Sequence, residues 1–311
     1  MKYNIKNIAV LLGAGLVTVS CNESDRFEKE QYEKIVYALS YTDHAFPITH
    51  MLTGEVSVGY VSVGLSGSLP DNEDIVVEFE RDPDALEQYN ILNFDLDSTK
   101  YAKELGTEHF AITDYKAIIK AGEVIGTMPI EFRPEGLSPD SIYMVPLKIK
   151  SISKYAVNEE LQSVLYRIML ENEYASQEGQ TSYFMKGAEI KEDGSETMIA
   201  AGKRVFPLTK NQIRMTVHTK PFKDDATYIR ENSMIITVLE GGNVSIVPVD
   251  PNYLEIEQIG NKEQNHYGPD VVGTLRFDLC YKFRTRTFDS ESSTYNEWSE
   301  WKTIRENLKR Q

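Results

Sequence analysis

Leu275-Arg-Phe-Asp-Leu-Cys-Tyr-Lys-Phe283 alternates apolar and charged side chains almost without interruption. Successive side chains of a strand point to opposite faces, so Leu275, Phe277, Leu279, Tyr281 and Phe283 share one face. The opposite face carries Arg276, Asp278, Lys282 and Arg284. A sheet with one apolar and one wet face is typical of antiparallel sandwiches and barrels. The stretch therefore predicts a long antiparallel strand over residues 271–288.

A hairpin is expected shortly before this strand. Residues 233–239 and 244–249 are strand-like runs rich in Val and Ile, joined by Glu240-Gly-Gly-Asn243. Gly241 and Gly242 permit positive φ in the turn. Another strand is expected over 212–218, so residues 160–311 read as an antiparallel β-barrel or sandwich.

The first half of the chain also reads as strands. Residues 74–80 place Ile75, Val77 and Phe79 on one face, and residues 142–150 alternate in the same way. Pro146 removes a backbone donor, which predicts a sheet edge or a β-bulge there. The alternation of residues 55–60 is out of phase with that of 61–65, which predicts a β-bulge near Tyr60.

One short helix interrupts these strands. Asp82 is a suitable N-cap, and Pro83 is suited to the first helical position. The helix is expected over about 82–90, because strand alternation breaks there.

Polar residues over 151–160 indicate a domain boundary. The expected domains are 35–153, a β-sandwich, and 160–311. Residues 161–170 follow the boundary. They alternate like a strand, although a helix fits that length almost as well.

The N-terminus carries the features of an export signal. Lys2 and Lys6 precede an apolar run over 8–17, and small residues lead to Cys21. The run is too short for a membrane span, which needs about 20 apolar residues. The segment resembles a bacterial lipobox, in which the cysteine is lipidated. Thr18 departs from the Leu that most lipoboxes carry, although Bacteroidetes signals are more relaxed there. We expect a signal peptide over 1–20 and lipid attachment at Cys21; the alternative is an ordinary secretory signal.

The acidic segment after Cys21 and the net charge of the chain indicate where the protein is located. Residues 21–34 form the lipidated cysteine and a tether whose acidic stretch over 22–30 resembles the patch of surface-exported Bacteroidetes lipoproteins. The alternative is a plain solvated tether. Removing Lys2 and Lys6 with the signal lowers the formal net charge from −15 to −17. Such a chain repels nucleic acid and anionic lipid surfaces. We expect outer-membrane attachment through the lipid alone, facing the cell exterior; the alternative is the periplasmic face.

The residues expected of an active site or metal centre are missing from the sequence. None of the five histidines pairs at metal-ligand spacing, and no nucleophile motif is present. Residues 71–74 and 95–98 offer oxygen ligands but lack EF-hand spacing, so they read as turns. Cys280 reads as a small residue packed in a sheet, and His218 as a surface histidine. The sequence predicts no enzyme, no cofactor and no metal.

Aromatic residues near the C-terminus are the candidates for ligand binding. Tyr295, Trp298 and Trp301 lie close together among polar residues, and sugar rings stack on such flat side chains. The alternative is that the tryptophans plug the end of a barrel. Tyr253, His266 and Tyr267 lie in or near a loop-rich stretch, 260–269, that is a further candidate for a cleft rim.

Several phrases resemble a two-domain type of Bacteroidetes surface lipoprotein, found in polysaccharide-utilisation loci. They are Val63-Gly-Leu-Ser-Gly67, Asp74-Ile-Val-Val-Glu-Phe-Glu-Arg-Asp82, Tyr89-Asn90, Ile119-Lys-Ala-Gly122, Ile142-Tyr-Met-Val-Pro-Leu-Lys-Ile-Lys-Ser151, Phe206-Pro-Leu-Thr-Lys-Asn-Gln-Ile-Arg-Met215, the Leu275–Phe283 strand, and Trp301-Lys-Thr-Ile-Arg-Glu-Asn-Leu308. The resemblance implies an all-β chain, with an immunoglobulin-like sandwich followed by a lipocalin-like antiparallel barrel, both of unknown function. It also implies genes for glycan importers and glycoside hydrolases nearby.

Together these features predict a non-catalytic surface lipoprotein that binds glycans in support of an outer-membrane importer. Importer components or lipoproteins of the same locus are the expected protein partners. Two alternatives stay open: a structural or adhesive lipoprotein, such as a fimbria-associated component, and a barrel that holds a small apolar ligand.

Overall fold

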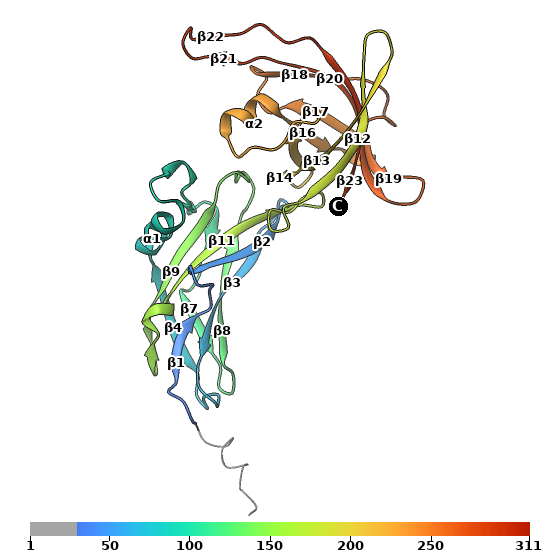
Figure 1. Ribbon diagram of the computed structural model, residues 1–311. Helices are drawn as coiled ribbons and strands as arrows, with labels where there is room; N and C mark the ends of the chain where they lie inside the picture. The colour runs from blue at the N-terminus through green and yellow to red at the C-terminus, as the bar shows by residue number, and fades with distance from the viewer. Residues whose placement is uncertain (1–29) are drawn as a thin grey trace, which may run out of the picture.

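The computed structural model describes residues 30–311 as two β-rich domains, one above the other in Figure 1. Nearly all of the regular structure is strand, so the all-β expectation is confirmed, with a sandwich first and a barrel-like domain second. Within these residues, no helix has the length and apolar character needed to cross a membrane.

The first domain is built on an 11-stranded sheet that folds back on itself. Its order is β10-β1-β3-β8-β7-β4-β9-β11-β2, with β5 paired to β9 and β6 to β8. The two halves enclose a core that includes Val61, Phe79, Phe132 and Leu147. Its elements are β1 (Ile35–Ala38), β2 (Ala45–Met51), β3 (Ser57–Leu65), β4 (Ile75–Arg81), α1 (Pro83–Phe94), η3 (Ser98–Lys100), β5 (Lys103–Glu104), β6 (Phe110–Ala111), β7 (Lys116–Ile119), β8 (Ile125–Phe132), β9 (Tyr143–Ile152), β10 (Ala156–Val157), η4 (Glu159–Leu161) and β11 (Ser163–Glu171).

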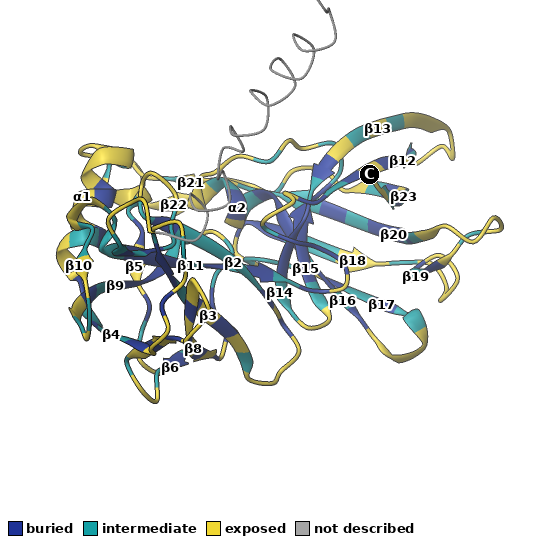
Figure 2. Ribbon diagram, turned by 90° about the horizontal axis from the view of Figure 1, so that it is seen from below, coloured by how far each residue is buried: buried dark blue, intermediate teal, exposed yellow. Residues whose placement is uncertain are grey.

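The second domain combines a curled 6-stranded sheet with a 4-stranded sheet. The first has the order β13-β12-β23-β20-β18, with β19 on β20, and the second is β14-β15-β16-β17. Figure 2 shows the buried strands inside each domain. The elements are β12 (Ser182–Ile190), β13 (Glu196–Arg204), β14 (Phe206–Thr209), β15 (Gln212–Thr216), α2 (Ala226–Asn232), β16 (Ser233–Val238), η5 (Glu240–Gly242), β17 (Val244–Pro248), β18 (Leu254–Gln258), β19 (His266–Pro269), β20 (Leu275–Thr285), β21 (Phe288–Asp289), β22 (Thr294–Tyr295) and β23 (Lys302–Arg310).

Several local predictions are confirmed. Strand β20 buries Phe277, Leu279, Tyr281 and Phe283 and directs its charged residues outward. Strands β16 and β17 form the expected hairpin, with positive φ at Gly241 and Gly242. Helix α1 begins at Pro83 after Asp82. The carboxylate of Asp82 does not cap the helix, because it accepts a hydrogen bond from Ser163 Oγ at 2.7 Å instead.

Two predictions about strand irregularity are wrong. Strand β3 pairs with β8 without a register shift, so there is no bulge at Tyr60. The out-of-phase residues keep the strand register and point Val58 and Tyr60 to solvent, where about half of each is exposed. Strand β9 lies between β4 and β11 rather than at an edge, and its register shift against β4 falls beyond Pro146. Pro146 has no backbone N–H to donate, but its carbonyl oxygen accepts a hydrogen bond from the backbone N–H of Asp82, just after the end of β4. The absence of the N–H is tolerated at this position, where strand β4 ends.

One strand pairs across the expected domain boundary. Strand β11 pairs antiparallel with β9 and parallel with β2, so residues 163–171 complete the sheet of the first domain. The expected second domain, 160–311, therefore begins with a strand that pairs in the sheet of the first, and the division itself stays a prediction. Local alternation identified β11 as a strand, but it carries no information about which sheet the strand joins.

Candidate functional site

The predicted aromatic residues lie together beside the outer face of β20. Their rings pack against cationic side chains of β20 and of Arg286, which directly follows that strand. The distances below run from the guanidinium carbon to the ring centroid. Arg286 Cζ lies 4.3 Å from both Tyr295 and Trp298. Arg284 Cζ lies 5.0 Å from Trp298 and 4.8 Å from Trp301.

This arrangement, which we call the cation–aromatic ladder, leaves little free ring surface at its centre. Two guanidinium groups already lie over Trp298, and Arg284 is held by Glu255 at 2.6 Å. A sugar stacking on Trp298 would have to displace one of them, losing cation–π contacts of about 0.5–1 kcal/mol each. Trp301 keeps 38% of its surface exposed, so the pair does not plug a barrel interior. Sugar binding at this trio remains a prediction that the geometry does not favour.

The other aromatic candidates do not gather at a cleft. Tyr253 is buried and contacts Tyr295 edge-on, with ring centroids 5.4 Å apart. Tyr267 packs in the core of the second domain, 4.5 Å from Phe277, and His266 Nε2 lies 3.2 Å from Gly241 O.

A different site lies between the two domains. We call it the interdomain pocket, and its volume is about 350 Å³. It falls within the usual range of ligand pockets, at the lower end. Its lining comes from the loop before β9, from β11, from the segment joining β11 to β12, and from the second domain: Pro139, Asp140, Ser141, Ile142, Arg167, Met169, Ser176, Gln177, Glu178, Gln180, Arg204, Val205, Phe206, Phe222 and Asp224.

The outer face of β11 explains why this pocket exists. The even-numbered residues of β11 point into the core of the first domain. On the opposite face, Leu165 is covered by α1, whereas Arg167 and Met169 lie beyond the helix and line the pocket. The second domain covers this remaining part of the face.

Polar contacts between the domains brace the pocket. Arg214 of β15 forms a two-bond ion pair with Asp140, and only 6% of the Arg214 side chain is exposed. Asn172 Nδ2 donates to Thr209 O at 2.7 Å and to Gln212 O at 2.9 Å. These bonds therefore join the two domains beside the pocket.

Aromatic rings form one wall of the pocket. Phe206 and Phe222 have ring centroids 4.7 Å apart. Arg204 Cζ lies 5.0 Å from the Phe206 centroid and 5.2 Å from the Phe222 centroid. Phe206 is buried, whereas Phe222 is partly exposed, with Arg204 and Phe206 covering part of its ring, so a ligand would contact the ring surface that these two leave open.

Two arginines of the pocket have donors without partners. The Nε atoms of Arg167 and Arg204 are buried and form no hydrogen bond within residues 30–311, nor does either guanidinium form an ion pair there. A buried donor left unsatisfied costs about 1–3 kcal/mol. Sequence analysis missed Arg167, although apolar Leu165 and Met169 flank it on the same face and signal burial on both sides of the strand.

Another groove lies beside α1, with a volume of about 660 Å³. Six of its eighteen lining residues are acidic, among them Asp82, Asp84, Glu159 and Glu160, and Tyr89 is its one phenol ring. Lys148 Nζ lies 3.6 Å from Glu80 Oε1 and 4.0 Å from Asp82 Oδ1. Part of the negative charge of the groove is therefore already compensated. The groove has fewer features of a sugar site than the interdomain pocket has.

One buried pair has the residue types of a nucleophile and a base. His50 Nδ1 lies 2.6 Å from Ser57 Oγ, and His50 Nε2 lies 2.9 Å from Tyr166 Oη. A Cβ on Gly59 would lie 1.8 Å from Tyr166 Oη, so glycine is required for this close contact. Burial lowers the pKa of His50 to about 4, which makes the imidazole a weak base. Neither His50 nor Ser57 lines the grooves above.

The remaining titratable candidates have structural partners. In residues 30–311 no group of three or more His, Cys, Asp or Glu side chains is placed to hold a metal. Asp71 binds Tyr155 and Lys154, and Asp74 binds Lys120, as expected of turns. Cys280 is a buried free thiol. His218 is not a surface histidine, since its side chain is only 16% exposed beside Glu189.

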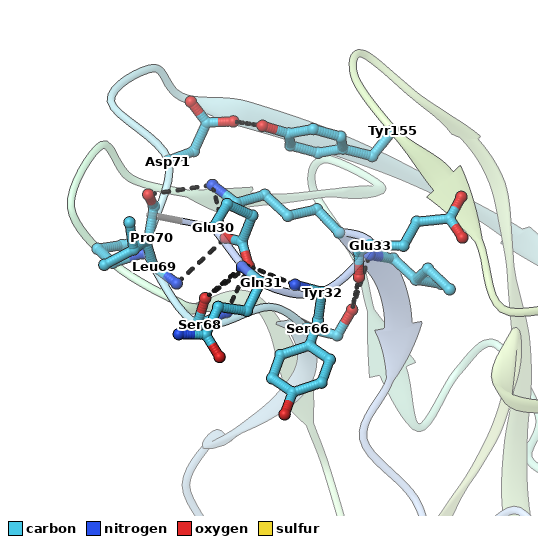
Figure 3. Close-up of polar contacts among 12 residues, drawn as sticks. Glu30, Gln31, Tyr32, Glu33, Ser66, Ser68, Leu69, Pro70, Asp71 and Tyr155 are labelled. Carbon is cyan, nitrogen blue, oxygen red and sulfur yellow. Dashed lines mark hydrogen bonds and ion pairs between the residues drawn. The ribbon is translucent and has the colours of Figure 1, made fainter. Parts of the chain in front are cut away.

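The tether enters the first domain at Glu30 (Figure 3). The Glu30 carboxylate accepts backbone hydrogen bonds from Ser68 at 2.7 Å, Tyr32 at 3.1 Å and Leu69 at 3.2 Å. These bonds, chiefly that from Ser68, lower the pKa of Glu30 to about 2. This attachment and the second domain lie at opposite ends of the molecule in Figure 1. Cys21 and the signal over 1–20 lie outside the described residues.

Comparisons with family models reproduce the two-domain organisation. Residues 28–156 match a family model for an N-terminal domain, and residues 162–309 match one for a C-terminal domain. The second match begins before β11, so this domain family includes the strand that completes the first sheet. Curated protein sequences give no match.

Solved structures share the complete architecture. A Bacteroides ovatus protein of unknown function is 17% identical, with a TM-score of 0.66, over 90% of this chain and 95% of its own. A second B. ovatus protein, described as multidomain, is 15% identical with a TM-score of 0.62, over 88% and 94%. An auxiliary nutrient binding protein from B. thetaiotaomicron is 15% identical with a TM-score of 0.57, over 87% and 93%. These matches support the resemblance to two-domain Bacteroidetes proteins; at such identities they establish the fold alone.

Proposed function

We propose that this chain, whose two domains have the architecture of these Bacteroides proteins, is a non-catalytic surface lipoprotein that binds saccharides in support of an outer-membrane importer. The observation that carries the proposal is the interdomain pocket, where a partly exposed Phe222 lies beside Arg167 and Arg204, whose Nε donors have no partner. Aromatic rings stack against the C–H faces of sugars, and planar guanidinium groups donate to oxygens in pairs.

The position of the pocket suits a surface role. The chain beyond Cys21 reaches Glu30 within nine residues, which span at most about 30 Å when extended. With the lipid at Cys21, the first domain lies close to the membrane and the second points away from it. The pocket between them is then open to soluble ligands.

Two observations support a binding role over catalysis. The acidic groove beside α1 is partly neutralised by Lys148, and the His50–Ser57 pair lies outside the grooves described. The alternative of a barrel holding an apolar ligand has little support, because Tyr183, Phe277, Tyr281 and Leu308 fill the interior of the second domain.

A glycan-array screen of the mature chain, followed by calorimetry, tests the proposal. Phe222→Ala is expected to weaken a saccharide ligand by about 1–3 kcal/mol, the scale of a lost aromatic anchor. Phe184→Ala, at a partly exposed phenylalanine outside the pocket, is the matched control and should leave affinity unchanged. If Trp298→Ala or Trp301→Ala weakens binding instead, the site is the predicted aromatic trio.

The lipid anchor has its own experiment. Cells expressing the full chain should incorporate labelled fatty acid at residue 21, and Cys21→Ala should abolish both the label and membrane fractionation. Protease accessibility on intact cells then distinguishes the outward-facing orientation from the periplasmic one.

One observation favours the structural or adhesive alternative. The outer face of β3, β7 and β8 exposes apolar side chains, each 38–54% exposed: Val58, Tyr60, Ile118 and Ile125. Contiguous exposed apolar surface is typical of protein contacts. A silent glycan screen with folded protein would favour this alternative.

A further inference from the structure

We infer that the interdomain pocket selects saccharides bearing an anionic substituent, a carboxylate or a sulfate. This inference rests on the proposed function and specifies the ligand class of the same site. It follows from how charge and hydrogen-bond donors are distributed over the pocket lining.

The pocket contains two guanidinium groups that no protein group neutralises. Arg167 and Arg204 form no ion pair in residues 30–311, and the Nε of each is buried without an acceptor. Ion pairs occupy other arginines of the described residues, such as Arg305 with Glu196 and Arg214 with Asp140. Arg167 and Arg204 differ because they line one pocket together and each keeps a buried Nε without an acceptor.

The acidic residues of the pocket lining do not neutralise Arg167 and Arg204. Asp140 is committed to Arg214 through two hydrogen bonds. Glu178 and Asp224 are exposed, and Glu178 accepts from Thr49. Their charges are solvated, whereas the arginine Nε atoms are shielded from water and gain more from an acceptor.

Anionic groups match these donors better than hydroxyls do. A carboxylate or sulfate accepts two parallel bonds from one guanidinium, and such charge-assisted bonds are roughly twice as strong as neutral ones. Phe222 beside them provides the surface for the sugar ring that bears the substituent. The small volume, about 350 Å³, suits a terminal or short charged saccharide rather than the middle of a long chain.

The net charge of the protein does not oppose this local preference. The chain carries −15 overall, and exposed charges beyond about 8 Å are largely screened at physiological ionic strength. The acidic surface disfavours long polyanions at low salt, so selection depends on the two arginines inside the pocket.

Calorimetry on the mature chain with three probes tests the inference: neutral xylo-oligosaccharides, oligogalacturonates and chondroitin sulfate disaccharides. We expect binding of one charged probe, with affinity falling as salt rises. Arg167→Gln and Arg204→Gln should each reduce that affinity at least about tenfold, and Arg204→Lys should retain part of it. Arg305→Gln, on the outer face of β23, is the matched control and should change nothing.

The outcomes separate this inference from the proposed function. Binding of neutral saccharides that is weakened by Phe222→Ala but unaffected by the arginine variants would overturn the anionic class and keep the function. Binding of none of the probes, with a silent glycan array and folded protein, would overturn both. Binding of oligogalacturonate identifies the carboxylate as sufficient, whereas binding of the chondroitin sulfate disaccharide that is lost with its unsulfated form, which keeps the carboxylate, identifies the sulfate.

Discussion

Lys203 and Glu306 form an ion pair with no exposed side-chain surface, 2.7 Å between Nζ and Oε1, inside the second domain. Tyr281 Oη donates to the same carboxylate at 3.2 Å, while Glu306 Oε2 has no partner among the described residues. Burial lowers the pKa of Lys203, and the adjacent carboxylate opposes this effect. Removing water from two charges costs several kcal/mol for each, so the pair is tolerated because each charge compensates the other.

Breaking this pair on one side should be strongly destabilising. Lys203→Met leaves a buried carboxylate without its cation, and we expect the free energy of unfolding to fall by about 3–5 kcal/mol. The double variant Lys203→Met/Glu306→Leu should recover most of this loss. Urea unfolding at pH 7 measures both. Arg305→Gln, which breaks an exposed ion pair with Glu196, is the control, and it should lower the free energy of unfolding by less than about 1 kcal/mol. An equally small effect of Lys203→Met would contradict the prediction.

His50 should make the first domain sensitive to acid. Its folded pKa of about 4 lies below the unfolded value of 6.5, so the unfolded chain takes up the proton first as the pH falls. The neutral form of His50 contributes about 3 kcal/mol to the free energy of unfolding. This contribution is complete above pH 6.5 and is lost as the pH falls toward 4. Unfolding free energies measured from pH 7 to 4 should show this slope. His50→Gln should flatten it, whereas His266→Gln should not.

The cation–aromatic ladder should act mainly on local stability. Arg286→Ala removes contacts with Tyr295 and Trp298, and we expect a loss of about 0.5–2 kcal/mol. Tryptophan fluorescence should change, because the guanidinium leaves the ring face. Saccharide affinity should stay within about twofold of the wild type, a change of under 0.5 kcal/mol. A larger loss of affinity would place the saccharide site at Tyr295, Trp298 and Trp301 instead of the interdomain pocket.

Glu30 should hold the tether against the base of the first domain. Its lowered pKa means that the ionised form is stabilised by folding, so docking persists above about pH 4.5 and is lost as the pH falls toward 2. Glu30→Gln should increase hydrogen exchange at the amides of Ser68 and Leu69 at neutral pH. Glu33→Gln, at a neighbouring acid outside these bonds, is the control. Unchanged exchange in Glu30→Gln would mean that the carboxylate does not fix the segment.

The sequence carried a usable signal for some buried charges. Glu306 lies between Ile304 and Leu308 in the apolar phase of β23, and Lys203 shares a face of β13 with Ile199 and Ala201. A charged residue in an apolar phase predicts a buried partner of opposite sign. The partner itself could not be named, because Lys203 and Glu306 meet across strands that are distant in the chain.

By itself, the sequence determined the strand content, the hairpin at Gly241, the start of α1 at Pro83 and the two faces of β20, because these follow from side-chain periodicity and local backbone preferences. The tertiary structure alone decided that β11 completes the first sheet, that Val58 and Tyr60 point to solvent, and that Arg167, Arg204 and Phe222 line one pocket. Periodicity states which residues share a face, whereas pairing between distant strands and the docking of two domains decide what covers that face. The interdomain pocket depends on both, since β11 supplies one wall and the second domain supplies the other.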